Sequence, residues 1–166
     1  MLTISQAQSE AQITAARELM REYTTWAFTL IEGSDKAPTF QDLEAELESL
    51  PGIYGLPAGR LLLATQNGEA AGCVCLRRID ATTAELKRLY VRPAFRGQHI
   101  GWRLVNQLLA EARESGYRRI ILDSHVSMKT AHTLYETVGF WRVPASADFP
   151  ASLKPEVVFM ACDLPA

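Results

Sequence analysis

Cysteine, histidine and long apolar runs are scarce in this 166-residue chain, and each scarcity excludes a class of protein. The three cysteines (Cys73, Cys75 and Cys162) are odd in number and include no C-x-x-C pair, which argues against a disulfide framework and a zinc site. The three histidines show no H-x-x-x-H spacing, so we expect no metal. No apolar run approaches the roughly 20 residues of a membrane span, and the first residues lack a signal-peptide pattern. We therefore expect a cytoplasmic protein without a membrane partner.

An excess of positive charge is also lacking, because the formal net charge is −2, which argues against nucleic acid as a partner. The charge is unevenly distributed. Residues 1–60 carry four bases against nine acids, a net charge of −5, whereas residues 61–166 carry thirteen bases against ten acids, a net charge of +3. Seven of these bases lie within residues 77–103. Such a patch favours a small polyanionic ligand, although a solvated strand face explains the same charges equally well.

The pattern that is present predicts one α/β domain over residues 1–166. Ser9, Thr39 and Ser127 are expected to begin helices as N-caps, and Asn67-Gly68 is a hairpin signal. The expected helices cover residues 10–30, 40–50, 99–114 and 128–137. The expected strands cover residues 2–6, 60–66, 70–79, 84–91, 117–123, 140–143 and 157–164.

The order of these elements predicts the topology of the sheet. Strand 84–91, helix 99–114 and strand 117–123 should form a right-handed crossover, so these two strands should be parallel. The three strands between residues 60 and 91 should form an antiparallel meander. We therefore expect a mixed α/β (α+β) fold, with a twisted, mostly antiparallel sheet of about seven strands and helices on both faces.

The segment between strand 84–91 and the next helix has the features of a phosphate site. A helix N-terminus presents unsatisfied N–H groups and a partial positive charge. Gly97 lets the backbone approach a ligand closely, Gly101 removes a side chain from the first helical turn, and Arg92 and Arg96 add charge. The residues alone do not identify the phosphate compound, since neither a P-loop nor a dinucleotide G-x-G-x-x-G motif is present.

Two segments resemble the signatures of one family. Residues 89–101, LYVRPAFRGQHIG, look like the acetyl-CoA signature of the GNAT superfamily of N-acetyltransferases. Residues 131–140, AHTLYETVGF, look like the C-terminal signature of the same superfamily. The resemblance covers roughly residues 60–163. It implies a GNAT-like sheet with a β-bulge in strand 86–91, and a following parallel strand that splays away to leave a slot for the cofactor.

The resemblance also implies roles for individual residues. Acetyl-CoA would be the cosubstrate, and the acceptor would be the amine of a small molecule or peptide. The Leu89 amide would stabilise the oxyanion, Tyr135 would protonate the leaving thiolate, and Glu85 would take the amine's proton. The implied cofactor-binding residues are Leu89, Tyr90, Val91, Arg96, Gly97, Gln98, His99, Ile100, Gly101, Trp102 and Tyr135.

Several of these positions have a second interpretation. Glu85 is equally consistent with a strand charge beside Arg77 or Lys87. Core packing is the weaker, second interpretation of Tyr135. His99 stands where the family has glycine, which costs about 1 kcal/mol if φ is positive and little if the residue is helical. His99 would add charge to the phosphate site when protonated, which is a hypothesis. Met128 stands where many members have asparagine.

We expect an N-acetyltransferase in which the amine attacks the thioester directly in a ternary complex. The sequence leaves two alternative functions open, a CoA-binding regulatory module without turnover and a transferase of a longer acyl group. It also leaves open whether the protein forms a homodimer. His125 either reaches the cofactor slot or is a structural histidine. Five aromatics are candidates for the acceptor pocket, although ordinary core packing is the stronger explanation for each one: Tyr23, Trp26, Phe28, Trp141 and Phe149.

Overall fold

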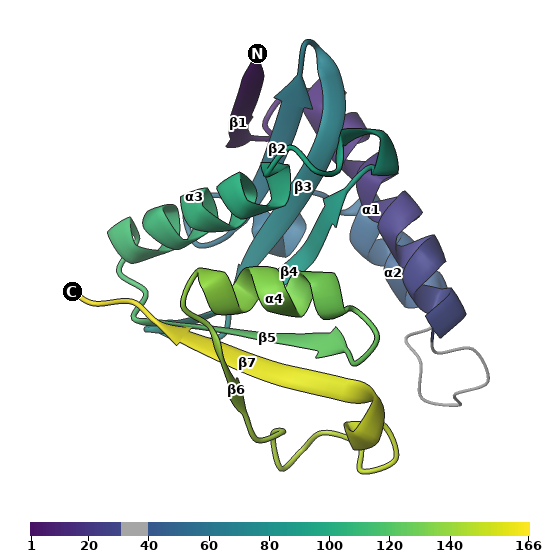
Figure 1. Ribbon diagram of the computed structural model, residues 1–166. Coiled ribbons are helices and arrows are strands. Elements are labelled where there is room, and N and C mark those ends of the chain that lie inside the picture. The colour runs from purple at the N-terminus through teal and green to yellow at the C-terminus, as the bar shows by residue number, and fades with distance from the viewer. Residues whose placement is uncertain (31–39) are drawn as a thin grey trace.

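The computed structural model describes residues 1–30 and 40–166, which form a mixed sheet with helices on both faces (Figure 1). The described strands form a seven-stranded sheet in the order β1-β2-β3-β4-β5-β7-β6. The strands are β1 (Leu2–Gln6), β2 (Arg60–Gln66), β3 (Glu69–Arg78), β4 (Thr83–Val91), β5 (Arg119–His125), β6 (Trp141–Val143) and β7 (Val157–Asp163). The helices are α1 (Glu10–Leu30), α2 (Phe40–Glu48), α3 (Ile100–Glu114) and α4 (Lys129–Thr137), with 3-10 turns at Gly52–Tyr54, Pro93–Phe95 and Lys154–Glu156.

The strand pairing confirms the predicted fold class. β4 and β5 are parallel, and the other neighbouring strands are antiparallel. The expected start of β5 at Tyr117 is wrong by two residues. The Tyr117 side chain is buried instead and donates a hydrogen bond to the Ala58 carbonyl at 2.7 Å, so the chain enters the sheet at Arg119.

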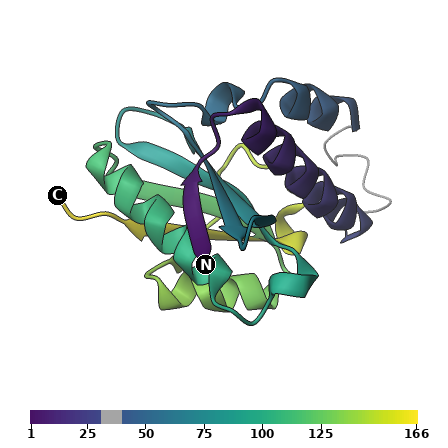
Figure 2. The same cartoon turned by 90° about the horizontal axis from the view of Figure 1, so that it is seen from above.

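Alternation along the strands divides the core into two layers, one on each side of the sheet. Leu62, Val74 and Leu76 face α3 and α4, whereas Leu61 and Cys75 face α1 and α2. Figure 2 shows the two helix pairs on opposite sides of the sheet. Cys73 is also fully buried on the α1–α2 side, in agreement with its interpretation as a small apolar residue.

The helix N-termini follow the predictions in part. The Ser9 hydroxyl accepts a hydrogen bond from the Gln12 amide, and the Gln12 side chain accepts one from the Ser9 amide, so Ser9 caps α1 as predicted. Thr39 lies outside the described residues. The prediction for Ser127 is wrong: Met128 is the N-cap of α4, because the Ser127 hydroxyl lies 2.8 Å from His125 Nδ1.

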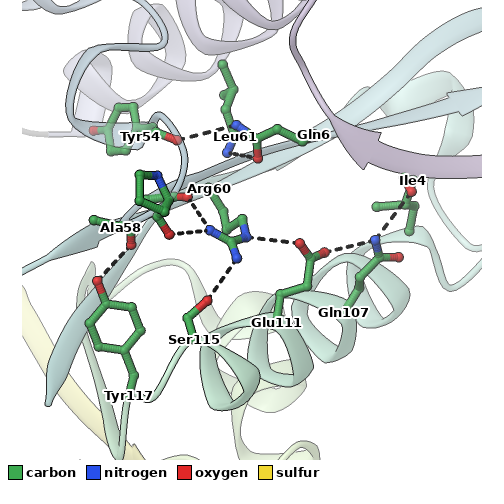
Figure 3. Close-up of polar contacts among 12 residues, drawn as sticks. Ile4, Gln6, Tyr54, Ala58, Arg60, Leu61, Gln107, Glu111, Ser115 and Tyr117 are labelled. Carbon is green, nitrogen blue, oxygen red and sulfur yellow. Dashed lines mark hydrogen bonds and ion pairs between the residues drawn. The ribbon is translucent and has the colours of Figure 1, made fainter.

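A polar network fixes α3 against the first strands of the sheet (Figure 3). The guanidinium of Arg60, whose side chain is only 12% exposed, donates to Glu111 at 3.0 Å and to Ser115 at 2.8 Å on α3. It also donates to the carbonyls of Pro57 and Gly59. These contacts hold the C-terminal end of α3 against the start of β2.

Among the helices of the described residues, none combines the length and the apolar character of a membrane-spanning segment.

Candidate active site

The sheet opens between its two parallel strands. Over the described residues, β4 pairs with β5 only at Thr83–Glu85, opposite Arg119–Ile121, although β4 continues to Val91 and β5 to His125. Figure 1 shows the two strands diverging beyond this short ladder. The splayed parallel pair that the resemblance implied is therefore present, and it leaves a gap beside the second half of β4.

A β-bulge lies in β4 at the point where the gap begins. Cys73 pairs with Tyr90 and Cys75 pairs with Lys87, so β4 has one extra residue between the two pairs. Arg88 within the bulge has a left-handed φ of 60°. Gly72, which pairs with Val91 just beyond the bulge, has no room for a side chain, because a Cβ there would lie 2.6 Å from the Tyr90 carbonyl oxygen.

Arg88 is held in this strained conformation by a contact with α2. Its guanidinium forms an ion pair with Glu46 at 3.0 Å, and Glu46 also accepts a hydrogen bond from the Tyr54 hydroxyl at 2.9 Å. The favourable Coulomb interaction with Glu46 contributes to a raised pKa of Arg88, although burial opposes that change. The bulge is thus tied to the helical layer on the α1–α2 side.

A groove of about 540 Å³ runs along the gap, from the β4–α3 loop to the N-terminus of α4. Nine of the predicted cofactor-binding residues line it; Gln98 is exposed and Tyr135 buried, and both lie outside this lining. Lining residues that the sequence analysis did not assign to the cofactor include Ser127, Met128, Lys129 and Thr130. The predicted lining residues are Leu89, Tyr90, Val91, Arg96, Gly97, His99, Ile100, Gly101 and Trp102.

The β4–α3 loop requires two left-handed residues. Gly97 has a φ of 83°, and a Cβ on Gly97 would project into open space. His99 is the N-cap of α3 with a φ of 61° and no side-chain capping bond. The costly alternative of the sequence analysis is therefore the correct one, since His99 adopts the conformation that glycine favours.

Two arginines beside the loop have different surroundings. Arg96 lines the groove, and its Nε donates to the Val91 carbonyl at 3.0 Å. Arg92 forms an ion pair with Glu22 of α1 at 2.7 Å, so its charge is largely neutralised. The hydrogen bond to Glu22 is the largest cause of the raised pKa of Arg92. Arg96 thus offers a positive charge to a ligand at this end of the groove.

Tyr135 approaches the gap from α4. Its side chain is buried, and its ring lies 5.5 Å from that of Phe140. Burial raises the pKa of Tyr135, and the nearby Tyr23 and Asp123 raise it further. The Tyr135 phenol is therefore protonated across the physiological pH range.

The carboxylates beside the gap are in contrasting states. Glu85 accepts a short 2.6 Å hydrogen bond from Arg77 of β3, the arrangement that the sequence analysis gave as its alternative to a catalytic base. The Asp123 side chain forms no hydrogen bond or ion pair with any other described residue, whereas its backbone belongs to the ladder with β7 opposite Phe159. Water reaches Asp123, yet protein crowding is the largest cause of its raised pKa, followed by the charge of Glu85. The sequence analysis missed Asp123, whose only signal was its place after the apolar run of β5.

Two of the five candidate acceptor-pocket aromatics line the groove, and the other three lie elsewhere. Tyr23 and Trp26 line it. Phe28 packs in the core between the sheet and α1, and Phe149 packs edge-on against Phe159. Trp141 lies on the edge strand β6 beneath the Arg119 guanidinium. His125 Nδ1 lies 2.8 Å from the Ser127 hydroxyl and accepts a hydrogen bond from the Ser127 amide.

Comparisons with known proteins agree with this architecture. The chain is 34% identical to an uncharacterized N-acetyltransferase of Schizosaccharomyces pombe over 76% of its own length and 77% of that protein. An acetyltransferase from Streptococcus agalactiae shares the fold with a TM-score of 0.77 and 21% identity, over 98% of both chains. The PaiA N-acetyltransferase from Thermoplasma acidophilum, solved with coenzyme A, has a TM-score of 0.73 and 18% identity over 98% of this chain and 99% of its own.

A mixed sheet that opens between two parallel strands, with a helix N-terminus at the opening, defines the architecture of an N-acetyltransferase. The chain belongs to the acetyltransferase (GNAT) family, whose sequence model matches residues 17–140. The matched range contains both walls of the groove, from β4 and α3 to α4.

Proposed function

We propose that this acetyltransferase uses acetyl-CoA to acetylate a primary amine of a small molecule or peptide, by direct attack in a ternary complex. The observation that carries the proposal is the groove along the unpaired side of β4, which is lined by the N-terminus of α3 and by Tyr23 and Trp26 of α1. The coenzyme A in the Thermoplasma acidophilum relative supports the choice of cosubstrate.

The pyrophosphate of the cosubstrate would bind at the β4–α3 loop. Backbone N–H groups at the start of α3 and the partial positive charge of the helix favour an anion there. The absence of a side chain at Gly97 keeps this part of the groove open, and Arg96 adds a full charge. The pantetheine arm would then follow β4 from Val91 to Leu89, where backbone groups beyond the short β4–β5 ladder face the gap.

The acyl transfer needs two further groups, one for the oxyanion and one for the leaving thiolate. The Leu89 amide is the proposed donor to the oxyanion of the tetrahedral intermediate. Tyr135 is the proposed acid that protonates the leaving thiolate; its raised pKa keeps the phenol protonated until that step. The predicted role of Glu85 as base remains untested, and its carboxylate is paired with Arg77.

Release of free thiol from acetyl-CoA in the presence of a panel of primary amines tests this function. We expect amine-dependent release by the parent enzyme and a loss of about 100-fold or more in kcat in Tyr135→Phe, because this variant cannot donate the proton. Tight CoA binding without release, and no effect of Tyr135→Phe, would instead identify a regulatory module. A faster reaction with propionyl-CoA or butyryl-CoA than with acetyl-CoA would identify a transferase of longer acyl groups.

A further inference from the structure

Asp123 occupies the position where the two parallel strands have just separated. The last pair of the ladder joins Glu85 to Ile121, and Asp123 lies two residues further along β5. Ile120 and Leu122 are buried toward α3 and α4, so strand alternation directs Asp123 toward α1 and α2. Its charge is felt by Tyr23 from α1 and Tyr135 from α4, whose pKa values it raises. Asp123 therefore faces the α1–α2 side of the sheet at the start of the gap.

The other carboxylates around the gap are already paired. Glu85 is bound by Arg77 at 2.6 Å, Glu46 by Arg88 at 3.0 Å and Glu22 by Arg92 at 2.7 Å. A carboxylate already bonded to a guanidinium has fewer oxygen lone pairs free to bind the ammonium group of an acceptor. In the described ranges 1–30 and 40–166, Asp123 is the carboxylate beside the gap that forms no such pair.

We propose that Asp123, rather than Glu85, is the base that binds the ammonium group of the acceptor and removes its proton. The assignment rests on the proposed function. Crowding by protein and repulsion from Glu85 raise the pKa of Asp123 above its ordinary value, and a higher pKa makes a carboxylate a stronger base. The charged and titratable groups around Asp123 are Glu85, Lys87 and Arg88 of β4, Arg77 of β3, Tyr23 of α1, Tyr135 of α4 and His125 of β5.

Asp123 and Tyr135 together account for every proton that moves in the reaction. An alkyl ammonium with a pKa of about 10.4 is almost wholly protonated near neutral pH. Asp123 takes one proton from it and later releases this proton to water. The freed nitrogen lone pair forms the C–N bond, and the C–S bond breaks as the oxyanion collapses. The thiolate takes the phenolic proton of Tyr135, which recovers the second proton that the nitrogen still carries.

Three carboxylate-to-amide variants of the full chain test the assignment. Asp123→Asn removes the proposed base, and Glu85→Gln removes the alternative base. Asp163→Asn is the control: Asp163 lies on β7 and contacts Arg119 at the opposite end of β5 from Asp123. Thiol release from acetyl-CoA is followed with spermidine, lysine and a dipeptide as acceptors. If none of these amines is acetylated, the hydrolysis of acetyl-CoA, in which water is the acceptor, is followed instead. Acetyl-CoA affinity is measured separately by calorimetry.

We expect kcat to fall by about 100-fold or more in Asp123→Asn, by much less in Glu85→Gln and not at all in Asp163→Asn. The defect of Asp123→Asn should shrink as pH rises toward the pKa of the amine, because alkali removes the proton without a base. Acetyl-CoA affinity should be unchanged. An equal or larger loss in Glu85→Gln, or a defect of Asp123→Asn that is constant with pH, would overturn the assignment. A parent that binds acetyl-CoA but releases no thiol would instead remove the proposed function, and with it this role.

Discussion

Asp123 is a residue whose ionised form the folded protein disfavours. Its pKa lies above the ordinary value of 3.8, so the folded state binds the proton more tightly than the unfolded state does. Stability therefore falls as pH rises from 3.8 through the raised pKa, and the loss persists at neutral pH. We expect Asp123→Asn to raise the melting temperature at neutral pH, and this gain should vanish at low pH, where Asp123 is protonated in both states.

Glu85→Gln supplies the opposite expectation on the neighbouring strand. The Glu85–Arg77 ion pair stabilises the folded state by about 0.2–1 kcal/mol at a partly exposed site, so its loss should lower the melting temperature slightly. Scanning calorimetry of both variants between acidic and neutral pH distinguishes the two effects. A lower melting temperature of Asp123→Asn at neutral pH would show that Asp123 makes a stabilising contact.

His99 is a second residue whose local conformation has an energetic cost. Its φ of 61° is left-handed, which costs about 1–2 kcal/mol for most residues. Histidine tolerates this region better than β-branched residues do. We expect His99→Gly to stabilise the protein by up to about 1 kcal/mol and His99→Val to destabilise it by at least as much. Urea denaturation measures both values, and equal stabilities of the three proteins would contradict the left-handed conformation.

At the scale of elements, the position of α3 depends on Arg60. The Arg60 side chain joins the start of β2 to Glu111 and Ser115, near the C-terminal end of the helix whose N-terminus forms the groove. Hydrogen bonds to charged groups contribute about 1.5–3 kcal/mol each. We therefore expect Arg60→Met to lower the free energy of unfolding by roughly 2 kcal/mol.

The same change should affect the groove. Acetyl-CoA affinity should fall as well, because α3 is less firmly held at the loop. Arg113→Met is the control on the same helix, since Arg113 donates to the C-terminal Ala166 outside this network. Urea denaturation and calorimetric titration provide the two measurements. A loss of stability without a loss of affinity would show that the loop is positioned independently of this network.

The elements themselves could be predicted because their signals are local. The Ser9–Gln12 capping box and the Asn67-Gly68 turn each depend on a few adjacent residues, and both form as expected. Ser127 failed as a cap because its hydroxyl contacts His125. The bulge in β4 was anticipated through the resemblance to the GNAT superfamily, and no pattern in residues 86–91 alone indicated it.

The state of the carboxylates could not be predicted, because it depends on pairs between distant segments. Glu46 reaches Arg88, and Glu22 reaches Arg92, across separations of 42 and 70 residues. Only when these contacts are known does Asp123 stand out as the unpaired carboxylate beside the gap in the described ranges.

At the scale of the whole molecule, the gap divides the sheet into two parts. One contains β1–β4 with α1–α3, and the other contains β5–β7 with α4 (Figure 1). Over the described residues, the two parts of the sheet are joined by the short β4–β5 ladder and by contacts such as those of the Arg118 and Arg119 amides with the Thr82 carbonyl. Residues from both parts line the groove, so a ligand that fills it must contact both.

A ligand that binds the folded state alone stabilises it by about 2.7 kcal/mol at 100 times its dissociation constant. We expect CoA to give a stabilisation of this size and to slow amide hydrogen exchange on both walls, at residues 86–91 of β4 and 129–137 of α4.

Gly101→Val should weaken both effects, because a Cβ at Gly101 would lie 3.3 Å from Leu134 of α4 and 3.7 Å from Val91 of β4. A valine there would force the walls apart or fill the groove. Gly116→Ala is the control, since a Cβ at Gly116 meets nothing within 4 Å and its positive φ affects folding rather than the groove. Protection confined to β4 would mean that CoA contacts one part of the sheet alone, whereas protection of both parts that disappears in Gly101→Val would show that the ligand binds across the gap.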